Sequence, residues 1–201
     1  MPDGDFDLAD AYAVETPDDN RDLYARWAAT YESMFIADNG YVYHLGVVGS
    51  FVDTASDGDD PVLDVGCGTG LVGVALRATG PWTVDGLDLS AEMLREARVK
   101  VTGEGHPVYR HLHEGDLTAT LDIPSGAYGA VVSCGTFTHG HVGPTAFDEL
   151  YRITRPGGLF AVGINLDHFV NLGFADRFVD DVAAGRITEP VIRRVNTYEA
   201  G

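Results

Sequence analysis

The sequence predicts an α/β fold, in which a doubly wound, mostly parallel sheet is covered by helices on both faces. Two observations lead to this prediction. Short apolar segments of strand type alternate with segments of helical periodicity from about residue 61 to residue 164. A glycine-rich turn, residues 66–70, directly follows the first of these strand-like segments. The length of 201 residues is enough for one domain with a sizeable core.

The expected strands are short and mostly apolar, as buried strands of a parallel sheet are. The first leads into the glycine-rich turn, and the later ones are separated by segments long enough for crossover helices. A further strand is expected near the end of the chain. The expected strands cover residues 61–65, 82–87, 107–112, 128–133, 159–164 and 191–198.

Apolar residues at steps of three and four predict the helices. One face of Tyr24, Trp27, Tyr31 and Met34 predicts a helix that begins near residue 21, and a second helix over 41–53 is expected to turn Leu45, Val48 and Val52 inward. Ser90 is the expected N-cap of a helix, with Glu92 in its first turn. The remaining helices are expected at 71–79, 144–154 and 175–184.

Composition excludes several classes of protein. The net charge of −18 repels a phosphate backbone, so no nucleic-acid partner is expected. No apolar run approaches the ~20 residues that cross a bilayer, so no membrane partner is expected either. Two cysteines do not make a disulfide framework, which favours a reducing, cytoplasmic location. The histidines form no metal-ligand pattern with the cysteines, and no metal is expected.

The glycine-rich turn is the segment that indicates chemistry. A strand delivers Asp64, and the alternate glycines Gly66, Gly68 and Gly70 then lead into a helix. Glycine allows positive φ and close approach of a ligand to the backbone, and the helix N-terminus offers free N–H groups. Residues 68–73 also satisfy the G-x-G-x-x-G dinucleotide fingerprint, with Asp88 twenty residues beyond Gly68, so a nicotinamide-dependent oxidoreductase is an alternative.

Four motifs in order resemble those of the class I S-adenosylmethionine-dependent methyltransferases, which have a Rossmann-like fold. They are residues 63–70 (LDVGCGTG), 86–94 (GLDLSAEML), 114–117 (EGDL) and 155–159 (RPGGL). Residues 24–32 resemble the N-terminal lid helix of the small-molecule branch, which divides the chain into an arm with lid helices (1–60) and a cofactor-binding core (61–201). Residues 133–140 are similar to the methyltransferase-like proteins of the Williams–Beuren syndrome region.

The resemblance implies a role for each matching residue toward S-adenosylmethionine, whose product is S-adenosylhomocysteine. Gly66, Gly68 and Gly70 would line the methionine end, which Asp64 helps to hold. Asp88 would accept both ribose hydroxyls. The adenine would lie near Leu89, Met93, Asp116 and the Leu117 N–H, while the methyl-bearing sulfur would lie near Ser133. Further cofactor-binding candidates, for which core packing is the alternative, are Trp27, Tyr31 and Cys67.

The predicted reaction is methyl transfer to an oxygen, nitrogen or sulfur of a small-molecule acceptor. His139 is the candidate catalytic base, because an imidazole removes protons near neutral pH. A non-catalytic S-adenosylmethionine-binding module is a further alternative. The residues after 164 supply only one strand, 191–198, where the family usually has a hairpin. The resulting free sheet edge makes a homodimer possible.

Overall fold

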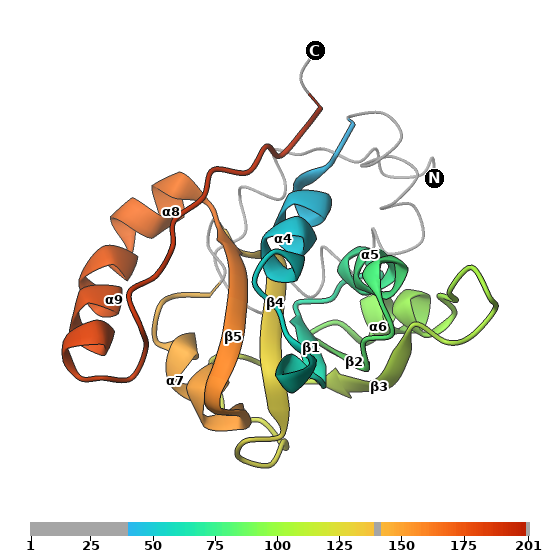
Figure 1. The fold of residues 1–201 in the computed structure, drawn as a ribbon, viewed down its shortest axis with the longest axis horizontal. Helices are drawn as coiled ribbons and strands as arrows, with labels where there is room; N and C mark the ends of the chain where they lie inside the picture. Colours follow the sequence, from blue (N-terminus) through green and yellow to red (C-terminus); the bar gives the residue numbers. More distant parts are fainter. Residues whose placement is uncertain (1–39, 139–141, 200–201) are drawn as a thin grey trace, which may run out of the picture.

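The computed structural model describes residues 40–138 and 142–199 (Figure 1). Their five strands form one parallel sheet in the order β3-β2-β1-β4-β5. The fold class is therefore confirmed, and β1 lies at the centre, where the strand order reverses. The strands are β1 Val62–Val65, β2 Val84–Asp88, β3 Tyr109–Glu114, β4 Tyr128–Phe137 and β5 Thr154–Ile164.

Helices cover both faces of this sheet. On one face, a core cluster joins α4, α5 and α6 to the sheet and contains Phe51, Leu76 and Leu94. On the other face, a second cluster contains Leu150 of α7 and Phe174 of α9. The helices are α4 Tyr43–Val52, α5 Leu71–Thr79, α6 Ala91–Arg98, α7 Ala146–Ile153, α8 Leu166–Asn171 and α9 Phe174–Ala183, with a 3-10 turn at Asp57–Asp59.

Local sequence explains where several elements begin. Ser90 caps α6 as predicted, since its hydroxyl accepts the Met93 N–H at 3.2 Å. Gly70 precedes α5 with a φ of 104°, so the glycine-rich turn passes directly into that helix. Asn165, which the sequence analysis did not single out, caps the short α8 through the Asp167 and His168 N–H groups.

Several predicted strand boundaries are wrong, among them the start of the fifth strand, which begins at Thr154 rather than at residue 159. The 107–112 prediction is displaced, because Pro107 pairs instead in an isolated bridge with Val101 and β3 begins at Tyr109. The fourth strand does not end at Ser133 but continues to Phe137. Its register against β5 shifts between Ser133 and Phe137, where Gly135 has a φ of 81°. Gly135, which adopts the positive φ of this irregularity, made the stretch resemble a loop in the sequence.

The predicted strand over 191–198 is also wrong. Only an isolated bridge between Tyr198 and Tyr41 forms there. The segment instead runs along α4, where Val195 packs against Gly46 and Arg193 pairs with Asp53 at 2.7 Å. Within the described residues, β5 is therefore an edge strand of the sheet (Figure 1).

The inward face of α4 differs from the predicted one. Val48 is buried as expected, but Leu45 and Val52 are exposed, and Val47 and Phe51 are buried instead. Apolar residues surround this helix on most sides, so their spacing alone did not identify the face that meets the sheet. The predicted helix that contains Trp27 and Tyr31 lies outside the described residues.

Among the helices in the described ranges, none is long and apolar enough to cross a membrane.

Candidate functional site

The loop after β1 presents one open position at the carboxyl edge of the sheet. Gly66, Gly68 and Gly70 have φ values of 65°, 52° and 104°, which glycine adopts without strain. A Cβ on Gly66 would overlap Thr136 of β4. A Cβ on Gly68 would meet no atom within 4 Å. Gly68 is therefore the point of the loop at which a ligand can approach the backbone.

Asp88, at the end of β2, is held by the same loop. Its Oδ2 accepts the Gly68 N–H at 2.8 Å, and its Oδ1 accepts the Ser90 N–H at 2.9 Å. Burial raises the pKa of Asp88, while these backbone hydrogen bonds oppose the rise. Each carboxylate oxygen keeps a second lone pair, so the fixed Asp88 can still accept ligand hydroxyls.

Asp64 lies beneath the loop and is fully buried. Its Oδ2 accepts the Tyr109 hydroxyl at 2.7 Å, whereas its Oδ1 has no hydrogen-bond partner among the described residues. Burial raises the pKa of Asp64 to about 7, with an opposing effect of the Tyr109 hydrogen bond and a reinforcing effect of the negative Asp88. An unpaired buried oxygen is costly, so this atom indicates a place for a donor or cation from a ligand.

The residues predicted to surround an adenine follow β2 and β3. Leu89 is half-buried, and Met93 and Leu117 are buried. Asp116 uses Oδ1 to accept the N–H and hydroxyl of Thr118, both at 2.7 Å. Asp116 therefore stabilises its own turn, and its second oxygen is the one available to a ligand.

Two candidates near the end of β1 have contacts that explain them structurally. Ser133 is fully buried and donates its hydroxyl to the Val65 carbonyl at 2.8 Å, which ties β4 to β1. Cys67 is buried, and its N–H donates to the Leu87 carbonyl at 2.9 Å. Burial raises the pKa of the Cys67 thiol well above its usual value, so it is no nucleophile at neutral pH.

Three predicted site residues cannot be placed. Trp27, Tyr31 and the candidate base His139 lie outside the described residues. Their roles stay predictions.

The structure also brings forward residues that sequence reasoning missed. Tyr109 contacts Asp64 across 45 residues of chain. At the end of β4, the Cys134 thiol lies 3.4 Å from the Tyr41 hydroxyl, and the Tyr41 ring stacks on His44 at 5.6 Å. The His44 Nδ1 is buried and has no hydrogen-bond partner in residues 40–138 and 142–199. The sequence signal that could have pointed to Tyr109 is a set of glycines, Gly70, Gly73 and Gly86, that leave room for its ring.

Comparison with known proteins agrees with this geometry. Residues 62–158 match the family model described as a methyltransferase domain. The chain is 38% identical over 99 residues to human methyltransferase-like protein 27. The match covers 49% of this chain and 38% of the human protein. It is also 43% identical over 106 residues to the malonyl-[acyl-carrier protein] O-methyltransferase of Pectobacterium atrosepticum. That match covers 50% of this chain and 36% of the Pectobacterium protein. The chain thus spans less than half the length of these two relatives.

A solved structure shares the fold. It is the methyltransferase that forms a complex with the Trm112 methyltransferase activator of Haloferax volcanii, with a TM-score of 0.56 and 25% identity. The match covers 70% of this chain and 59% of that one. Residues 62–158 are therefore similar to a methyltransferase domain in both sequence and fold.

Proposed function

We propose that the protein is an S-adenosylmethionine-dependent methyltransferase that acts on a small-molecule acceptor. The observation that carries the proposal is the arrangement at the ends of β1 and β2. The open backbone of Gly68 is hydrogen-bonded to Asp88, and beneath it Asp64 keeps one buried oxygen unpaired. These carboxylate acceptors suit a ligand with a cationic end and a neighbouring diol.

The residues present fit the cofactor at both of these groups. Asp64 would face the ammonium of the amino-acid end, because its Oδ1 is unpaired and no cation is among the groups that shift its pKa. Asp88 would accept the ribose hydroxyls with its remaining lone pairs. Leu89 and Met93 would flank the adenine, and Asp116 with the Leu117 N–H would bind its edge.

S-adenosylmethionine, when bound, supplies an electrophilic methyl group on a sulfonium. The protein contributes orientation and exclusion of water, which together lower the barrier by about 7–11 kcal/mol when the geometry is well held. Thr136 and Ser133 help here, since both donate to the Val65 carbonyl and fix the end of β4 against the loop.

We propose His139 as the base when the acceptor arrives protonated. In that role, His139→Ala lowers kcat by roughly 10²–10⁴-fold and leaves the S-adenosylhomocysteine Kd unchanged. Steady-state kinetics across pH checks this, because the variant also loses the single inflection that the wild type shows. A variant with an altered KM alone would make His139 a residue that positions the acceptor.

A thermal melt with two ligands tests the proposal against the nicotinamide alternative. Ligand that binds only the folded state stabilises it by about 2.7 kcal/mol at 100 times Kd. We expect S-adenosylhomocysteine to raise Tm and NADH to leave it unchanged. A rise with NADH alone would overturn the assignment.

The non-catalytic alternative is tested by turnover. We expect methyl transfer to at least one acceptor in a screen of hydroxyl, amine and thiol compounds. Binding of S-adenosylhomocysteine without turnover of any acceptor class would favour a binding module. We also propose that the chain is related to the Williams–Beuren region proteins, a likeness that residues 133–140 carry.

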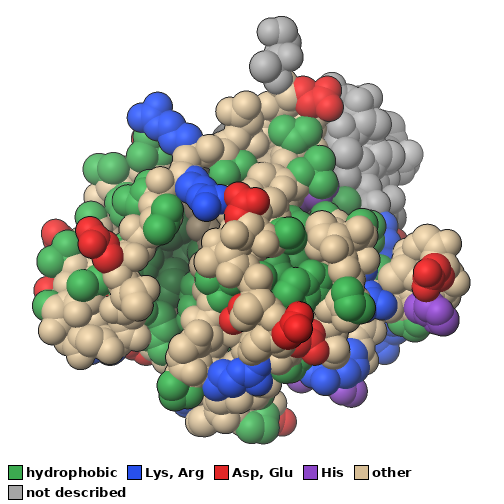
Figure 2. Space-filling model, in the orientation of Figure 1, with side chains coloured by type: hydrophobic (Ala, Val, Ile, Leu, Met, Phe, Trp, Pro, Cys, Tyr) green, Lys and Arg blue, Asp and Glu red, His purple; other side chains and the backbone are tan. Residues whose placement is uncertain are grey.

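We further propose a homodimer and a cytoplasmic location. Residues 159–164 of the edge strand β5 are half-buried and uncharged, and a second copy can pair with such an edge. Figure 2 shows hydrophobic side chains on the flank of the molecule where α8 and α9 lie. Exposed hydrophobic residues of α8 and of the segment after α9 are Leu166, Val170, Val191 and Ile192. Sedimentation equilibrium checks the dimer, and a monomer at all concentrations would contradict it. The two free cysteines, Cys67 and Cys134, suit a reducing compartment.

A further inference from the structure

The ring of Tyr109 fills a socket made of glycines. A Cβ on Gly70 would lie 3.1 Å from the ring, and one on Gly86 would also lie 3.1 Å from it. A Cβ on Gly73 would overlap the ring and its hydroxyl. Gly70 ends the glycine-rich turn, Gly73 lies in α5 and Gly86 lies in β2. The socket therefore holds a β3 side chain directly beneath the candidate cofactor site.

The socket aims the Tyr109 hydroxyl at one oxygen of Asp64. The hydroxyl donates to Oδ2 at 2.7 Å, and within the part of the chain that the structure describes Oδ1 has no hydrogen-bond partner. A carboxylate that is held by one oxygen cannot rotate freely, so the direction of the other oxygen is fixed. Tyr109 does not lie in the loop that would contact the ligand, and it acts only through Asp64.

We infer that Tyr109 is a positioning residue that orients Asp64 toward the amino-acid end of the cofactor. The inference rests on the proposed function and adds a residue to it. It predicts that Tyr109 affects ligands that carry the amino-acid end and leaves ligands without that end unaffected.

The charge on Asp64 gives this role a second readout. Asp64 is faced by Tyr109 from β3, Asp88 from β2, the thiols of Cys67 and Cys134, and the Gly73 backbone of α5. The Tyr109 hydrogen bond lowers the pKa of Asp64 against the effect of burial. Without the hydroxyl, Asp64 ionises at higher pH, so binding of a cationic ligand should need a higher pH as well.

The test compares two ligands on Tyr109→Phe by calorimetry. S-adenosylhomocysteine carries the amino-acid end, whereas 5′-methylthioadenosine has the same nucleoside and thioether without it. We expect Y109F to weaken S-adenosylhomocysteine binding by about tenfold or more and 5′-methylthioadenosine binding by less than twofold. The pH at which S-adenosylhomocysteine affinity rises should move upward in the variant.

Tyr128→Phe is the matched control. Tyr128 is another buried tyrosine whose hydroxyl donates to a buried carboxylate, Asp85, at 2.9 Å. Its loss should leave both Kd values within twofold of the wild type.

Four results would overturn the inference. Equal S-adenosylhomocysteine affinity in Y109F and wild type would overturn the inference about Tyr109 and leave the proposed function standing. An equal loss of affinity for both ligands would make Tyr109 a structural residue only. Failure of the wild type to bind S-adenosylhomocysteine would overturn the proposed function as well. If Y109F does not fold, the double variant Y109F/D64N, which has no buried charge at Asp64, should match D64N in Kd. A further loss in the double variant would contradict action through Asp64.

Discussion

Two buried carboxylates of this protein are held in different ways. Asp64, below the glycine loop, and Asp181, on α9, are both fully buried. Each accepts a tyrosine hydroxyl, from Tyr109 at 2.7 Å and from Tyr151 at 2.9 Å respectively. The two sites differ in what else surrounds the carboxylate.

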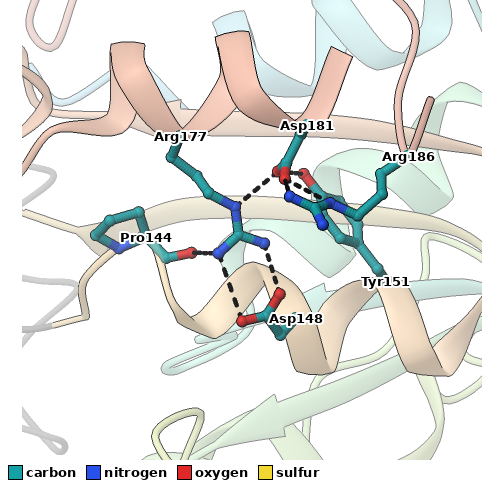
Figure 3. A network of polar contacts seen from close by, with 6 residues as sticks. All are labelled: Pro144, Asp148, Tyr151, Arg177, Asp181 and Arg186. Carbon is teal, nitrogen blue, oxygen red and sulfur yellow. Dashed lines mark hydrogen bonds and ion pairs between the residues drawn. The ribbon is translucent and has the colours of Figure 1, made fainter. Parts of the chain in front are cut away.

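Asp181 is neutralised by the protein itself (Figure 3). Arg177 donates to its Oδ2 at 2.8 Å, and Arg186 donates to its Oδ1 at 2.7 Å. Burial alone would raise the pKa of Asp181, but the hydrogen bonds from Arg177, Tyr151 and Arg186 outweigh burial and lower the pKa. Both oxygens are paired, and the network joins α9 to α7 and to the segment after α9.

Asp64 has no such cation among the described residues that influence it, and its pKa rises to about 7. A buried carboxylate in this state lacks a counter-charge that a ligand ammonium can supply. Burial of an acid therefore does not by itself indicate function. The functional signal is a buried acid whose partners are incomplete.

The largest expected effect comes from breaking the complete site. Asp181→Ala leaves two arginines around a buried gap and should lower the free energy of unfolding by about 3–5 kcal/mol. Urea denaturation measures this change. The S-adenosylhomocysteine Kd of the folded variant should stay within twofold of the wild type, and a large change in Kd would mean that the two sites are coupled.

A smaller effect is expected at the ligand-facing acid of β2. Asp88→Ala should weaken S-adenosylhomocysteine binding by about 1.5–3 kcal/mol, the value of hydrogen bonds to a charged group. Circular dichroism should remain that of the wild type. Calorimetric affinity within twofold of the wild type would show that Asp88 does not bind the ribose.

The smallest effect distinguishes the two carboxylates by pH. Asp181 has a lowered pKa when folded, so its stabilisation is present above the unfolded pKa and is lost as pH falls through the folded one. Asp64 has a raised pKa, so between the unfolded value of 3.8 and about 7 the folded state holds the extra proton. Its contribution to stability therefore falls as pH rises through that range.

Asp64→Asn removes this pH-dependent penalty. Relative to the wild type, the ligand-free variant should gain about 1–2 kcal/mol of unfolding free energy between pH 6 and pH 8. Denaturation series at the two pH values measure the gain. A gain that is the same at both would show that Asp64 is ionised throughout.

Much of the fold was predictable because it depends on local signals. The apolar run before Asp64, the three glycines after it and the Ser90 cap each act within a few residues, and all appear where predicted. The segment at 191–198 was mispredicted because its pairing with α4 depends on distant residues. The contact between Tyr109 and Asp64 was missed for the same reason, since 45 residues separate them in the chain.

We expect a cationic ligand to complete the site at Asp64 by pairing with its buried carboxylate. Calorimetry of S-adenosylhomocysteine binding at pH 7, in buffers of different ionisation enthalpy, counts the protons exchanged on binding. Because burial raises the pKa of Asp64 to about 7 in the free protein, binding of an ammonium should release protons from the wild type and none from D64N. Equal proton exchange in the two proteins, or proton uptake by the wild type, would contradict the claim.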